Sequence, residues 1–237
     1  QVDVTADNGV SELFAISFEV LTPTYTVSLN VIDNAIDFGS ETVGYESFAD
    51  STVTITKTGN SNITNLAVNL SGDNTDAFVI SDPISTSLTE GAPNTTFTVR
   101  PVDGLAYGTY NAVVTVTADN GVSEAFDLTF TVYSYQVSLN ADNPTVFETQ
   151  YLGYAAFEND TITITRAANG IITGLVVELS GTNPESFTVT QPEILTLDND
   201  NSSTIFTIKP NHGLAIGQYV ATVTVTANNA IEETFNV

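Results

Sequence analysis

Cysteine, methionine and tryptophan are all absent from this sequence of 237 residues. Without cysteine the chain has no disulfide, no thiolate nucleophile and no cysteine-ligated zinc. No apolar run approaches the roughly 18–20 residues that a helix needs to cross a bilayer. There is no signal peptide and no initiator methionine, and Gln1 stands within a strand-like segment. We therefore expect an internal window of a processed protein.

Basic residues are also scarce. Four Lys and Arg face 28 Asp and Glu, which gives a formal net charge of −24. Such a chain repels phosphate backbones and anionic lipid, so we expect no nucleic-acid partner and no membrane insertion in this segment. Hydrophobic residues make up 42% of the chain, which is ample for packed cores.

The residue pattern offers no catalytic group. His212 is the one histidine in the sequence, and the repeat described below aligns it with Asp103. A catalytic histidine needs a nucleophile or an orienting carboxylate, and no such pairing recurs. Glycine-rich phosphate loops are absent as well. We predict no catalytic residue, no bound cofactor and no enzymatic activity.

Internal repetition is the strongest signal in the sequence. The segment VDVTADNGVSELFAISFEV at 2–20 returns at 114–132 and again, shortened, at 223–237. Residues 38–128 align without a gap to 147–237, with about four positions in ten identical. The repeat predicts three parts: a C-terminal hairpin of a preceding unit at 1–20, one repeat at 21–133, and a second at 134–237 whose last strand is short.

Within each repeat the apolar residues alternate with threonine. In STVTIT (51–56) and FDLTFTV (126–132) every second side chain is apolar, which is the period of a half-buried strand. Turn signals such as TGN and DNG separate such segments every 8–12 residues. The sequence therefore predicts an all-β chain of tandem immunoglobulin-like antiparallel β-sandwiches. Strands of the first repeat are expected near 25–30, 36–39, 51–57, 64–71, 77–81, 95–101, 109–118 and 122–132.

The order FG, VGY, TVTITKTGN, ITNLAVNLSG, TFTVRP, GL, GTY and VTVTADNG resembles the immunoglobulin-like repeats of bacterial and archaeal surface proteins. Those repeats belong with the Hydin-type, major-sperm-protein-like sandwiches. In the second repeat TGN becomes AAN and FG becomes Phe147-Glu148, so the motifs vary even within this chain. The resemblance implies a stalk or surface module; a fold by itself does not fix function.

Six residues are candidates for a structural role. Tyr110 and Tyr219 stand in GTY and GQY at the start of the penultimate strand, where a tyrosine corner belongs. The alternative is that they contact a ligand. The four cations occupy two equivalent positions on strands expected to neighbour each other, where we predict that they offset nearby carboxylates: Lys57 with Arg166, and Arg100 with Lys209.

Calcium is the metal that this composition could bind, because it takes oxygen ligands. Asp198 and Asp200, in the run DNDN, are the best candidates, with a polar turn as the alternative. The first repeat has TEGA at that place, so a site there would not belong to the repeat. A second candidate lies at the expected joint between units, where three carboxylates occur: Asp33, Asp37 and Asp142.

The expected joints are short, which favours a stiff connection over a flexible linker. We predict an extracellular or cell-surface role as a structural spacer, stalk or filament-forming module. Its expected partners are neighbouring repeats of the same protein, with self-assembly by strand donation or lateral contact. Two alternatives stay open: an adhesion module that binds carbohydrate or protein, and an accessory domain of a secreted enzyme.

Overall fold

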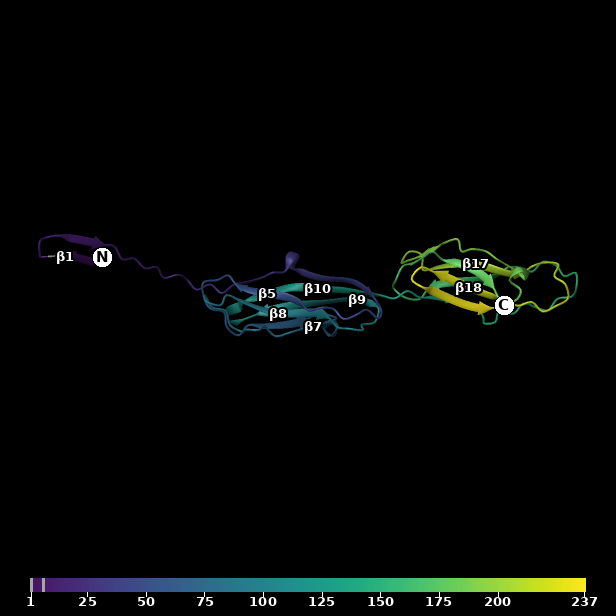
Figure 1. Cartoon of the computed structure of the whole chain (residues 1–237), viewed down its shortest axis with the longest axis horizontal. Helices are drawn as coiled ribbons and strands as arrows, with labels where there is room; N and C mark the ends of the chain where they lie inside the picture. Colours follow the sequence, from purple (N-terminus) through teal and green to yellow (C-terminus); the bar gives the residue numbers. More distant parts are fainter. Residues whose placement is uncertain (1, 6) are drawn as a thin grey trace. The chain divides into compact units, whose positions relative to one another are not determined.

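The computed structural model describes residues 2–5 and 7–237 and is built from strands joined by loops and single 3-10 turns (Figure 1). No α-helix occurs in these residues, so the predicted all-β class of immunoglobulin-like sandwiches is confirmed. The same residues contain no helix that is long and apolar enough to span a membrane.

A two-stranded hairpin comes first. Its strands are β1 (Val2–Thr5) and β2 (Ser11–Phe14), which pair antiparallel. The hairpin expected at 1–20 also includes Gln1 and Ala6, which lie outside the described residues. Residues 15–26 follow without regular secondary structure.

The next strands form two four-stranded sheets, ordered β3-β5-β8-β7 and β4-β10-β9-β6. The first sheet comprises β3 (Val27–Leu29), β5 (Ser51–Lys57), β8 (Asn94–Pro101) and β7 (Phe78–Ile80). The second comprises β4 (Ala35–Thr42), β10 (Ser123–Tyr133), β9 (Gly108–Thr117) and β6 (Ala67–Ser71). Three 3-10 turns join them: η1 (Ile32–Asn34), η2 (Thr75–Ala77) and η3 (Asp119–Gly121).

Alternation along these strands builds the core. Val53 and Ile55 of β5 are buried, as are Phe97 and Val99 of β8, while the intervening threonines are at least partly exposed. Val53 lies opposite Phe97 in the antiparallel ladder. Threonine keeps the β-branched shape that suits a strand and leaves its hydroxyl accessible to water.

A second sandwich follows, but residues 144–151, the equivalents of β4, form no strand in it. Its sheets are β11-β12-β17-β15 and β14-β18-β19, with the short pair β13-β16 beside them. The first comprises β11 (Val137–Leu139), β12 (Asp160–Arg166), β17 (Ser203–Pro210) and β15 (Phe187–Val189). The others are β14 (Val176–Ser180), β18 (Thr222–Ala227), β19 (Ile231–Asn236), β13 (Ile172–Thr173) and β16 (Thr196–Leu197), with η4 (Pro184–Ser186) between β14 and β15.

Equivalent core contacts recur in the two sandwiches. The ring centroids of Phe97 and Phe126 are 6.4 Å apart, and those of Phe206 and Phe235, their equivalents, are 6.5 Å apart. The strand lengths differ, however. The closing hairpin has strands of ten and eleven residues in the first sandwich (β9 and β10) and of six residues each in the second (β18 and β19).

The chain divides into two compact units. One comprises Gln1–Ile36, Ala49–Arg100 and Ala112–Asp127, and the other comprises Asp37–Phe48, Pro101–Asn111 and Leu128–Val237. The bounds of these units do not coincide with those of the repeats. The sequence-based boundaries at 20/21 and 133/134 therefore stay predictions.

Candidate functional site

An asparagine in a loop holds the segment that leads into the first sandwich. Asn60 follows β5, and its side-chain Oδ1 accepts a hydrogen bond from the Thr24 amide at 2.8 Å. Its Nδ2 donates to the Thr22 carbonyl at 3.0 Å, and its own amide donates to Thr24 Oγ1 at 2.9 Å. One side chain thus binds backbone groups 36 and 38 residues away in the sequence.

The second sandwich repeats this arrangement. Asn169 Oδ1 accepts from the Ser134 amide at 2.9 Å, and Nδ2 donates to the Val132 carbonyl at 2.8 Å. Asn169 is equivalent to Asn60 and is the one residue of TGN that persists in AAN. Its persistence in both repeats is a sequence signal for a structural role, which was not among the predictions. We call these two loops with their bonded partners the asparagine joints.

Close backbone packing accompanies each asparagine joint. A Cβ added to Gly59 would lie 2.2 Å from the Thr24 carbonyl oxygen. One added to Gly170 would lie 2.4 Å from the Tyr135 ring and 2.6 Å from the Ser134 carbonyl oxygen. The two glycines stand on opposite sides of the asparagine, since Gly59 precedes Asn60 and Gly170 follows Asn169. In each loop the incoming segment passes so close to the glycine that a Cβ there would clash.

Two of the four cations reinforce the same loops. Lys57 Nζ donates to the Gly59 carbonyl at 2.7 Å, and Arg166 Nη1 donates to the Asn169 carbonyl at 3.1 Å. Arg166 Nη2 also donates to Asn199 Oδ1 at 2.6 Å. These contacts are to carbonyl oxygens, so at this position the cations hold loop backbone and side-chain amide groups.

The other two cations lie on the neighbouring strands. β5 pairs with β8, and β12 with β17, which matches the expected adjacency. Arg100 Nε lies 3.4 Å from Asp50 Oδ1, with both side chains partly exposed. Lys209 is opposite Thr188 in the β15–β17 ladder. The carboxylate partner predicted for these positions is thus present at Arg100; an exposed pair of this kind contributes about 0–1 kcal/mol.

Both candidate tyrosines bond to backbone four residues upstream. The Tyr110 hydroxyl donates to the Ala106 carbonyl at 2.7 Å, and the Tyr219 hydroxyl donates to the Ala215 carbonyl at 3.0 Å. This is the geometry of a tyrosine corner. The structural role and the alternative role in ligand contact both stay predictions.

Two other tyrosines, which the sequence analysis did not single out, anchor the loops after β8 and β17. The Tyr154 hydroxyl donates to the Asn211 carbonyl at 2.6 Å, and Tyr45 donates to the Val102 carbonyl. Burial raises the pKa of the Tyr45 phenol. His212 is exposed, with its ring centroid 5.7 Å from that of Tyr154.

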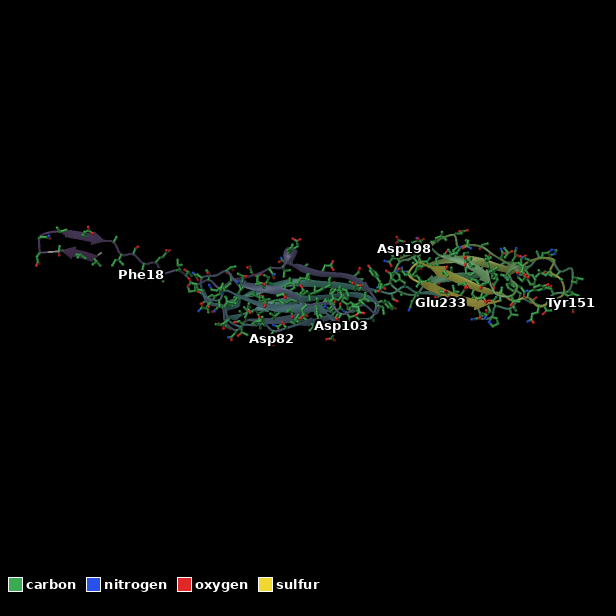
Figure 2. The ribbon with its side chains drawn as sticks, viewed as in Figure 1. Phe18, Asp82, Asp103, Tyr151, Asp198 and Glu233 are labelled. Carbon is green, nitrogen blue, oxygen red and sulfur yellow. The ribbon has the colours of Figure 1, made fainter. Side chains whose placement is uncertain are left out.

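Asp198, labelled in Figure 2, closes a turn. Its Oδ1 accepts the amides of Asn201 at 2.8 Å and Asp200 at 2.9 Å. The bond from the Asn201 amide is the main cause that holds the Asp198 pKa below its usual value. Across residues 2–5 and 7–237, no three Asp, Glu or His side chains are grouped as metal ligands. Of the three carboxylates expected at the joint, Asp37 accepts hydrogen bonds at its Oδ1 from the Gly39 amide and from Thr129 Oγ1.

The second sandwich carries an open groove of about 950 Å³. It runs between residues 144–152 and 214–221, which lie outside regular strands, and its lining includes Phe147, Phe157 and Val237. Its rim exposes large apolar side chains: Val146, Tyr151, Leu152, Ile216 and Val220. Figure 2 places Tyr151 at one end of this sandwich. We call this feature the end groove.

Comparisons with known proteins bear on the fold. No protein-family profile and no curated protein sequence matches this chain. The expected membership among Hydin-type surface repeats therefore rests on the quoted motifs and stays a prediction.

Solved structures do match. The extracellular cadherin domains 1–4 of protocadherin gamma B7 superpose with a TM-score of 0.55 at 10% identity, over 90% of this chain and 49% of that one. Domains 1–5 of protocadherin gamma B2 give 0.54 at 10% identity, over 91% of this chain and 38% of that one. Mouse cadherin-23 EC22-24 superposes with a TM-score of 0.50 at 13% identity, over 90% of this chain and 66% of that one. At these identities the likeness shows the fold alone, which is that of immunoglobulin-like β-sandwiches. The chain spans about half or less of the first two structures.

Proposed function

We propose that this chain is a non-enzymatic structural module of an extracellular or cell-surface protein, serving as a spacer, stalk or filament-forming segment. One observation carries the proposal: each sandwich binds the segment that leads into it through the same asparagine joint. In each joint the asparagine binds both an N–H and a C=O group of the incoming backbone. These directed hydrogen bonds resist rotation of the segment against the sandwich, which a Gly/Ser linker does not.

The neighbouring repeat of the same protein is the partner that this arrangement supports. The joint at Asn169 engages Val132 and Ser134, which flank the expected repeat boundary at 133/134. Tyr133 and Tyr135 add a ring contact, with centroids 6.4 Å apart. The segment between repeats is therefore held by one sandwich along its length, as a spacer needs.

Orientation measurements by NMR test the spacer role directly. Residual dipolar couplings from the two sandwiches of the 237-residue chain should fit a single alignment tensor. Asn169→Ala should make the two tensors diverge, whereas Asn159→Ala, at an exposed asparagine, should not. Independent tensors in the unaltered chain would exclude a stiff spacer, and hydrolysis of any substrate at an enzymatic rate would exclude the non-enzymatic assignment.

A second candidate function, adhesion to carbohydrate or protein, is favoured by the end groove. Its aromatic lining and exposed apolar rim are features of binding surfaces. A glycan array probed with the chain separates the two functions: specific retention by one glycan class favours the binding module.

A further inference from the structure

The first sandwich contains the counterpart of the end groove, and there a strand fills it. In the sheet order β4-β10-β9, the C-terminal half of β10 lies between β4 and β9. Phe130 and Val132 of β10 have no exposed surface. The Phe130 ring centroid is 5.3 Å from that of Tyr45 and 5.0 Å from that of Phe48. The Val43 amide donates to the Tyr133 carbonyl at 2.9 Å.

The second sandwich has the same aromatic residues beside its groove that pack around Phe130 in the first sandwich. Tyr154 and Phe157 are the equivalents of Tyr45 and Phe48, with ring centroids 5.5 Å apart, and both line the end groove. Backbone hydrogen bonds flank the end of the chain on both sides, next to the groove. On one side the Thr145 amide donates to the Asn236 carbonyl at 2.8 Å. On the other side Ala221 and Val237 exchange two backbone hydrogen bonds at 2.9 and 3.0 Å. The groove therefore continues the line of β19 between two backbone segments.

A segment of the right sequence is exposed elsewhere in the chain. Residues 16–20, Ile-Ser-Phe-Glu-Val, align with Leu-Thr-Phe-Thr-Val at 128–132. Ile16, Phe18 and Val20 are 69%, 88% and 81% exposed, although their counterparts in β10 are fully buried. Phe18 lies on the extended segment after β2 (Figure 2). Three large apolar side chains at alternate positions indicate a strand with one face to bury.

We propose that residues 15–20 of one copy add as a strand to the end groove of a second copy, which deepens the proposed structural role by naming the partner and its register. The strand runs antiparallel to 217–221, as β10 does to β9, and Phe18 packs against Tyr154 and Phe157.

The first sandwich fixes the register. The hydroxyls of Thr109 and Thr131 face each other across β9 and β10 at 3.3 Å. The equivalent pair is Gln218 of the acceptor and Glu19 of the donor, so an amide meets a carboxylate with no like charge directly opposite. Main-chain bonds from both flanking segments supply affinity, and alternate side chains supply specificity.

Contacts of this kind are head-to-tail, because donor and acceptor are different surfaces of the chain. A heterologous contact propagates into an open filament unless its rotation closes a ring. Each copy carries a net charge of −24, so the strand must bind against mutual repulsion. Association should therefore strengthen as salt screens the charges.

Sedimentation velocity of the 237-residue chain in moderate salt tests the donor. We expect concentration-dependent oligomers below about 100 µM chain. Phe18→Ser should weaken association about 100-fold, since it removes the central buried side chain from a segment outside both sandwiches. Glu19→Gln, at an outward position, should change it by less than about threefold.

A matched pair of extended chains tests the acceptor without perturbing its fold. Adding Thr-Phe-Thr-Val-Tyr after Val237, the sequence of residues 129–133, should fill the groove from within and leave the chain monomeric. Adding Thr-Ser-Thr-Ser-Tyr should leave association unchanged.

Three results would overturn the proposal: an unaltered chain that stays monomeric, undiminished association of Phe18→Ser, or undiminished association of the filled chain. A monomer whose two sandwiches share one alignment tensor would overturn strand donation and leave the spacer function standing. An associating chain whose two sandwiches have divergent alignment tensors would overturn the stiff spacer and leave strand donation standing.

Discussion

A single asparagine side chain carries both a donating NH2 group and an accepting carbonyl oxygen, so it can bind the N–H and C=O groups of a neighbouring backbone. Asn60 and Asn169 use both groups on the segment entering their sandwich, at distances of 2.8–3.0 Å. No other side chain of that size presents both polarities in this geometry, which explains why the asparagine persists where its neighbours change from TG to AA.

Asn169→Ala should lower the free energy of unfolding of the second sandwich by about 1–3 kcal/mol, because it leaves two partly buried backbone groups unpaired. Urea unfolding followed by amide NMR signals of residues 137–237 measures the effect on that sandwich alone. Asn159→Ala should stay within about 0.5 kcal/mol of the unaltered chain. Equal effects of the two variants would argue against the joint.

Asp198 shows how a carboxylate can be tied to a turn rather than to a metal. Its ionised form accepts two backbone amides, so its pKa in the folded chain lies below the value in an unfolded chain, about 3.9. The stabilisation is present above that unfolded value and is lost as the pH falls through the folded pKa. A carboxyl ¹³C titration should give a lower midpoint for Asp198 than a peptide of residues 194–203 does; coincident midpoints would contradict the turn assignment.

At the scale of elements, sequence periodicity located the strands because strand pairing and burial alternate with the same period of two. The expected segments 51–57 and 95–101 correspond to β5 (Ser51–Lys57) and β8 (Asn94–Pro101). The DNG turn also forms where it was predicted, with Asn120 at φ 62°. What periodicity could not show is the packing of loops, since Thr24 and Gly59 meet only after the sandwich folds.

Gly59→Ala tests that loop packing. The added Cβ would fall 2.2 Å from a backbone oxygen that cannot rotate away, so the first sandwich should lose about 1–3 kcal/mol of stability. Gly91→Ala is the matched control, because a Cβ there meets nothing within 4 Å. Thermal unfolding of both variants measures the difference; a Gly59→Ala chain as stable as Gly91→Ala would show that the incoming segment is free to move aside.

At the scale of the whole molecule, acidic residues far outnumber basic residues. With 28 acidic and four basic residues, the folded chain is destabilised by self-repulsion that salt reduces. Raising NaCl from about 20 mM to 500 mM should raise the melting temperature by a few degrees, equivalent to about 1 kcal/mol. An unchanged or lower melting temperature would contradict this.

The same measurement addresses calcium at Asp198 and Asp200. At matched ionic strength, CaCl₂ and NaCl should give the same melting temperature if the carboxylates only contribute to the overall field. An additional rise at low millimolar CaCl₂, lost in Asp198→Asn, would instead establish a specific site, since binding to the native state stabilises it by mass action.

The sequence by itself determined the fold class, the repeat, the strand positions and the tyrosine positions. These follow from local chemistry: β-branched residues, alternation and turn-forming Asn and Gly act over a few neighbouring residues. Only the tertiary structure decided that Asn169 forms hydrogen bonds with the segment at 132–134 and that the end groove lies beside Tyr154. Both depend on residues dozens of positions apart meeting in space, and no local pattern encodes which backbone groups remain available when the sheets have formed.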